Sequence, residues 1–163
     1  MMSLTDRDRA ILTRNQEMLN SVVTGDWAGY ATFCAEDLSC FEAETVGHLV
    51  EGLPFHQFYF DLPNDGSVMP PAVTVTMSRP HLRWLSDSAV VLSYTRLTQR
   101  LQNGEAITAS CCETRIWQER NGRWLQVHVH RSRAPGTPPQ SHSPSRRSLA
   151  RPPAHLSPLP IRF

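Results

Sequence analysis

The 163-residue sequence contains no lysine, and all 16 of its basic residues are arginine. A protein kinase needs a strand lysine, a glycine-rich loop and a catalytic-loop aspartate, so this chain is excluded from kinase-type phosphoryl transfer. The sequence also lacks any run of about 18 apolar residues, and its first residues are polar without a signal-peptide core. We therefore expect a cytoplasmic protein with no membrane partner.

Cysteine pairs of the kind that bind metal are also missing. The four cysteines are Cys34, Cys40, Cys111 and Cys112, and none forms a C-x-x-C pair or a zinc-type spacing with histidine. We expect reduced, mostly buried thiols, no metal and no cofactor. Adjacent Cys111 and Cys112 on a strand should point to opposite faces.

Acidic residues are absent from residues 134–163, which hold four arginines and eight of the 13 prolines. Residues 1–133 therefore carry twelve arginines against fifteen acids, a net charge of about −3. A mildly acidic domain does not suit a nucleic-acid partner. We predict a folded domain over 1–133 and a disordered Pro/Ser/Arg-rich tail over 134–163.

Helical spacing of apolar residues predicts a long helix from about Ser3 to Val23, with Thr5 as its N-cap and Gly25 after its end. A short helix from Trp27 to Phe33 should follow. The aromatic segment from Leu53 to Phe60 fits a helix or a strand, and its shared aromatic face favours a helix.

The rest of the folded part is rich in β-branched residues. Strands are predicted at Leu38–Phe41, Ala72–Met77, Ser88–Leu101, Ala106–Glu119 and Arg123–Ser132, with a loop over Leu62–Pro71. The pairs Asn103-Gly104 and Asn121-Gly122 are strong hairpin signals. The pattern predicts an α+β fold in which helices cover one face of an antiparallel meander.

Three arginines, Arg96, Arg115 and Arg131, interrupt strand patterns that otherwise look buried. A two-residue turn at Asn103-Gly104 would place Arg96 opposite Cys111. A three-residue turn over residues 120–122 would place Arg131 opposite Cys111 and Arg115 opposite Val127, so all three would share one face. A two-residue second turn would split the set. The hydrophobic pattern favours the three-residue turn, because it puts Leu125, Val127 and Val129 on the face of Cys111.

Three inward cations need negative partners. The candidates inside the chain are Glu42, Glu44, Glu51 and Glu113. Two interpretations stay open: the arginines pair with these acids, or they line a pocket for an anionic ligand. His128 and His130 share a strand face, which indicates a structural or interfacial role, and His56 is placed to border the pocket.

Many segments occur in an order and spacing that resembles one family. They are Gly25-Asp26-Trp27 with Tyr30, residues 38–42 (LSCFE), 47–52 (GHLVEG), 55–60 (FHQFYF), 94–99 (YTRLTQ), 113–117 (ETRIW), 121–124 (NGRW) and 127–132 (VHVHRS). Together they resemble the association domain, or hub, of calcium/calmodulin-dependent protein kinase II.

The resemblance implies a nuclear-transport-factor-2-like or cystatin-like roll, a cone in which a long helix lies in a strongly curved antiparallel sheet. It implies a non-enzymatic scaffold that assembles with itself into stacked rings of twelve or more subunits. It also implies a cavity lined by Arg96, Arg115, Arg131, His56 and Tyr30, to which we add Tyr59. The expected cavity ligands are acidic peptide segments or small carboxylates, and kinase-linked subunits are a further expected partner of the protein.

A second function stays open, because the same cone-shaped fold hosts isomerases and dehydratases. Such an enzyme needs a cavity base and a donor for the developing oxyanion. Departures from the family pattern are Asp61 to Asn64 after the aromatic segment, Arg133 in place of glycine, and the long tail. The chain begins directly with the hub, so it is either free-standing or a piece of a kinase.

Overall fold

The computed structural model describes residues 3–45, 47–61 and 73–133, apart from the side chains of Glu44 and Arg133. Helices and strands follow in the order α1 (Asp6–Thr24), α2 (Trp27–Phe33), β1 (Cys34–Phe41), a 3-10 turn (Ala43–Thr45), β2 (Val50–Glu51), α3 (Leu53–Asp61), β3 (Thr74–Ser86), β4 (Ala89–Gln102), β5 (Glu105–Arg120) and β6 (Arg123–Arg133). The predicted loop at 62–71 and the tail from residue 134 lie outside the described residues.

The predicted helices are confirmed together with their ends. Thr5 caps α1 through a reciprocal capping box with Asp8, and Gly25 ends it in a left-handed conformation with φ 70°. Asp26 begins α2 by accepting a hydrogen bond from the Gly29 amide at 2.9 Å. None of the helices in the described residues is both long enough and apolar enough to span a membrane.

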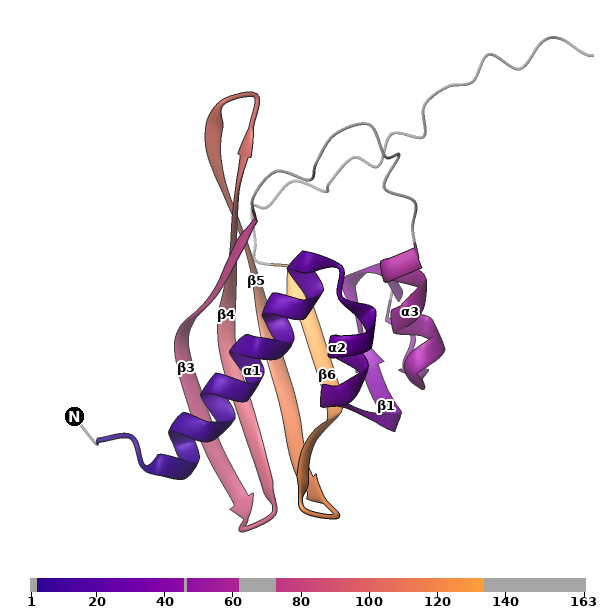
Figure 1. Ribbon diagram of the computed structural model, residues 1–163, viewed down its shortest axis with the longest axis vertical. Helices are drawn as coiled ribbons and strands as arrows, with labels where there is room; N and C mark the ends of the chain where they lie inside the picture. The colour runs from indigo at the N-terminus through magenta and orange to yellow at the C-terminus, as the bar shows by residue number, and fades with distance from the viewer. Residues whose placement is uncertain (1–2, 46, 62–72, 134–163) are drawn as a thin grey trace, which may run out of the picture.

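The strands form one open, curved sheet in the order β2-β1-β6-β5-β4-β3. Figure 1 shows α1 and α2 lying across one face of this sheet and α3 beside β1. The α+β prediction is therefore confirmed, except that the sheet is not purely antiparallel, because β1 runs parallel to β6.

Two strands are longer than predicted. β1 begins at Cys34 rather than Leu38, and β3 continues past Met77 to Ser86. The sequence signal failed in β3 because Arg79, with φ 53°, and Pro80 break the pairing with β4. This break is tolerated because β3 is the edge strand, where a missing amide donor disrupts no second neighbour.

The turn between β5 and β6 corrects the register prediction. Arg120 pairs with Arg123, so Asn121-Gly122 is a two-residue turn with both φ values positive, not the three-residue turn we expected. Trp117 then pairs with Gln126 but Ile116 pairs with His128, which leaves Val127 as an extra residue. This β-bulge reverses the parity of β6 beyond it.

The bulge decides where the rest of β6 points. Arg115 lies opposite Val129 and Glu113 opposite Arg131, so the predicted partners Val127 and Cys111 are wrong. All three arginines nevertheless lie on the helix-covered face. Before the bulge, the two-residue turn pairs Leu125, predicted on that face, with Gln118 on the outer side, and its expected place under the helices goes to Gln126.

Candidate functional site

Glu113 lies at the centre of a buried group of polar residues under the helices. On β5 it is two residues from both Cys111 and Arg115, and across the sheet it lies opposite Tyr94 of β4 and Arg131 of β6. Arg96 pairs with Cys111, as predicted from the first Asn-Gly turn. Glu113 is 2% exposed and Arg115 4% exposed, so an unpaired charge on either would be costly.

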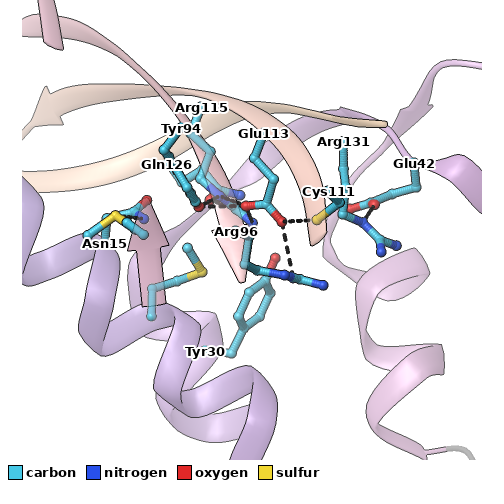
Figure 2. Close-up of polar contacts among 12 residues, drawn as sticks. Asn15, Tyr30, Glu42, Tyr94, Arg96, Cys111, Glu113, Arg115, Gln126 and Arg131 are labelled. Atoms are coloured by element: carbon cyan, nitrogen blue, oxygen red, sulfur yellow. Dashed lines mark hydrogen bonds and ion pairs between the residues drawn. The ribbon is translucent and has the colours of Figure 1, made fainter. Parts of the chain in front are cut away.

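One oxygen of the Glu113 carboxylate receives most of the donors. Oε2 accepts from the Tyr94 hydroxyl at 2.5 Å and from Arg115 Nε at 3.0 Å and Nη2 at 2.8 Å. Arg115 Nη1 also donates to Gln126, which is fully buried (Figure 2). Arg115 is thus held from several sides within the core.

The electrostatics of this pair follow from its partners. Burial favours the neutral acid, but Arg115, Arg96 and the Tyr94 hydrogen bond outweigh it and lower the pKa of Glu113 to about 2. Burial opposes the charge on Arg115, yet Glu113 keeps its pKa well above the usual value. The two groups stay ionised together at neutral pH.

Arg96 contacts the other oxygen of the same carboxylate. Its Nη1 lies 3.1 Å from Glu113 Oε1, and its side chain is 19% exposed. Among the described residues its buried Nε has no hydrogen-bond partner. In Figure 2 the Arg96 guanidinium lies on the side of Glu113 away from Arg115. Arg96 is therefore less fully engaged than Arg115.

Arg131 is held by a second acid. Its Nε donates to Glu42 just beyond β1, and its side chain is 21% exposed. Arg131 and Glu42 also line an open pocket of about 590 Å³ whose other lining residues are Phe41, Ala43, Gly47, His130 and Ser132. Of the four acids proposed as partners, Glu42 and Glu113 are thus the ones seen paired; the Glu44 side chain lies outside the described part.

The predicted histidine and tyrosines lie on the helical side of the cluster. His56 of α3 is buried, and its Nδ1 is 3.2 Å from the Tyr30 hydroxyl of α2. Burial, with the nearby charges of Arg115 and Arg131, lowers the pKa of His56 to about 4, so the ring is neutral at pH 7. Tyr59 packs edge-on against Phe55 and Phe58.

Other predicted residues lie on the outer face. Ser39 Oγ is 2.8 Å from His128 Nδ1, and the Phe41 ring lies edge-on to His128 and tilted against His130, in keeping with the structural role expected for this pair. Of the cysteines, only Cys112 is exposed. No cluster of three or more metal-type ligands occurs within the described part of the chain.

Sequence reasoning missed two buried amides, Asn15 and Gln126, and named Glu113 only as one of four acids. Asn15 accepts from Trp117 Nε1 at 3.3 Å and is fully buried in α1. A polar residue on the apolar face of a helix was the available signal for Asn15. Gln126 gave none, because its inward position follows from the two-residue turn, which pairs it with Trp117, and we expected a three-residue turn.

Comparison with known proteins places this chain in a family. The family model described as "Calcium/calmodulin dependent protein kinase II association domain" matches residues 7–135. Calcium/calmodulin-dependent protein kinase type II of Caenorhabditis elegans is 37% identical over 83% of this chain and 18% of its own length. The Drosophila melanogaster alpha chain is 37% identical over 77% of this chain and 24% of its own. This chain thus spans about a fifth of these relatives.

Solved structures agree. The Chlamydomonas reinhardtii CaMKII hub homology domain is 44% identical with a TM-score of 0.74, covering 80% of this chain and 99% of that one. The association domain of C. elegans CaMKII is 38% identical with a TM-score of 0.70, covering 77% and 95%. An NTF2-like protein from Rhodospirillum rubrum, 23% identical with a TM-score of 0.58 over 76% of this chain and 98% of that one, shares the fold. The chain therefore belongs to the calcium/calmodulin-dependent protein kinase II association domain family.

Proposed function

We propose that this domain is a homo-oligomerisation hub that assembles into a stacked ring of twelve or more copies. The observation that carries the proposal is the match to association and hub domains along nearly the whole described chain. A ring raises the local concentration of whatever is attached to its subunits, which gives avidity without new contacts.

The outer face of the sheet supports self-association. Eight adjacent positions of β4 and β5 that point away from the helices are uncharged, and no described helix covers them (Figure 1). They are Val91, Ser93, Thr95, Leu97, Ser110, Cys112, Thr114 and Ile116. Eight neighbouring positions without a charge suit burial against another copy better than permanent contact with water.

Native mass spectrometry and sedimentation velocity at micromolar concentration test the ring. We expect particles of at least twelve times 18.4 kDa. Ile116→Glu should break them into small species, because it places a charge on the outer face. Asn20→Glu on the exposed side of α1 is the matched control and should leave the particle intact. A monomer or plain dimer for the unchanged protein contradicts the proposal.

We further propose that the arginine cluster holds a carboxylate, presented by an acidic peptide segment or a small acid. Among the described residues, the guanidinium groups of Arg96, Arg115 and Arg131 face two carboxylates, those of Glu42 and Glu113, so a carboxylate ligand would suit this arginine-rich cluster. Calorimetric titration with propionate and with an acidic peptide tests this, and the absence of binding to both would refute it.

The alternative of a small enzyme has less support. A general base works best with a pKa near the working pH, whereas the pKa of Glu113 is lowered to about 2 and that of His56 to about 4. The family matched is the association part of these kinases and not their catalytic domain. Turnover of a ketosteroid-type substrate would favour the enzyme.

A further inference from the structure

The three arginines of the cluster differ in how much of their hydrogen-bonding capacity is already used. Arg115 is buried and donates to Glu113, Tyr94 and Gln126. The Arg96 guanidinium is only partly engaged. Its Nη1 contacts Glu113, and its buried Nε has no hydrogen-bond partner in the described residues. Because Nε is buried, a carboxylate from outside can reach this guanidinium only through its exposed part, and the Arg96 side chain is 19% exposed.

The two oxygens of Glu113 also differ. Oε2 accepts from Tyr94 and twice from Arg115, whereas Oε1 faces Arg96 at 3.1 Å and the Cys111 thiol at 3.7 Å. Glu113 is thus anchored through one oxygen and offers the other to Arg96. A carboxylate ligand that approaches Arg96 therefore meets a guanidinium that is already paired with the Glu113 carboxylate.

We propose that Glu113 is an internal anion that occupies Arg96 and so limits the affinity of the cluster for an outside carboxylate, while Arg115 does not touch the ligand. This inference rests on the proposed carboxylate-binding function. Glu113 acts here as a specificity-determining residue: it repels a second negative charge, and it leaves Arg96 and Arg131 as the contacts of the ligand. Arg115 is a positioning residue that holds Glu113 in place.

Calorimetric titration of the assembled chain with propionate tests the proposal. Glu113→Gln keeps the shape of the side chain and removes its charge, so propionate should bind at least about tenfold more tightly. A purely structural role predicts the opposite, since a loosened pocket binds less well. Glu51→Gln, at an exposed site on β2, makes the same charge change and should leave the affinity unchanged.

Glu113→Asp is the second variant, because removing the charge beside Arg115 endangers folding. It keeps that charge but is one methylene shorter. The carboxylate should stay with the three donors on Oε2 and withdraw from Arg96, so affinity should again rise, by less than in Glu113→Gln. If neither variant folds, Arg96→Met tests the proposal. Propionate affinity that is unchanged in Arg96→Met would overturn the assignment of Arg96 as a contact of the ligand.

The outcomes separate the two claims. Propionate binding by the unchanged protein with no gain in Glu113→Gln or Glu113→Asp overturns the role of Glu113 and leaves the carboxylate site standing. No binding by the unchanged protein but clear binding by Glu113→Gln refutes the proposed function and supports the internal anion. No binding by any of them overturns both.

Discussion

Trp84 Nε1 lies 2.8 Å from Asp8 Oδ1, which joins the edge strand β3 to the first turn of α1 across 76 positions of the chain. Asp8 also completes the capping box with Thr5, and Arg7 lies 4.1 Å over the Trp84 ring. One carboxylate therefore caps a helix and fixes that helix to the sheet.

Asp8→Ala should lower the free energy of unfolding by about 1–2 kcal/mol, because it removes the capping box and the tryptophan bond together. Urea denaturation measures the change. Asp6→Ala is the matched control, since Asp6 is an exposed acid of the same turn that pairs only with Arg9 among the contacts described here, and it should cost less. Equal losses in the two variants would contradict the special role of Asp8.

Substituting Arg115 and Arg96 by methionine should give very different stabilities. Arg115→Met leaves a buried carboxylate without its main partner, and such a break costs about 3–5 kcal/mol. Arg96→Met leaves Glu113 bound to Arg115 and Tyr94, so the loss should be small. Thermal and chemical denaturation of both variants check the order, and a larger loss for Arg96→Met would show that our division of roles is wrong.

His56 should make the domain sensitive to mild acid. Its pKa is lowered from 6.5 to about 4 in the folded state, so the unfolded chain binds the proton first as pH falls. The stability is complete above pH 6.5 and is lost as pH falls towards 4. His56→Asn, which retains a polar group near Tyr30, should flatten this part of the curve of unfolding free energy against pH. An unchanged slope would exclude His56 as its source.

Glu113 should add a second, more acidic region of stability loss. Its pKa is lowered from 4.5 to about 2, so its contribution is present above pH 4.5 and is lost as pH falls through 2. The slope of unfolding free energy between these values should disappear in Glu113→Gln, provided that the variant folds. A slope that persists there must arise from other carboxylates.

The four thiols should react at very different rates. Cys112 is exposed, while Cys34, Cys40 and Cys111 are buried, and burial raises the pKa of Cys34 and of Cys40 to about 11. In the Ile116→Glu variant, whose outer face should not be covered by another copy, an alkylating reagent at pH 8 should label Cys112 first, and adding Cys112→Ser should remove this fast phase. Mass spectrometry of the labelled peptides assigns the sites. Rapid labelling of Cys34 or Cys40 would contradict the packing described.

Much of the fold could be predicted from the sequence, because local side-chain chemistry marks the ends of its helices and its turns. Thr5, Gly25 and Asp26 mark the helix ends because capping depends on single side chains. The Asn103-Gly104 turn fixed the pairing of Arg96 with Cys111, because two residues with positive φ leave little choice of register. These signals act over a few residues and need no knowledge of the rest of the molecule.

The candidate site was predicted less completely. The inward position of Arg96, Arg115 and Arg131 was expected, but from a three-residue turn that does not exist. The bulge at Val127 depends on how β6 twists between β5 and the parallel strand β1, which no short pattern records. For the same reason the central place of Glu113, opposite Arg131, could not be read from spacing alone.

The bulge at Val127 has a consequence for comparing relatives of this domain. One residue added to the β5–β6 turn, together with loss of the bulge, would return Arg131 to the same partner on the same face. A one-residue gap at this turn in an alignment therefore need not mean an altered cluster, provided that a compensating gap occurs before the arginine. Equivalence of the cluster is better judged from the count of residues between the glutamate of β5 and the arginine of β6 than from turn length.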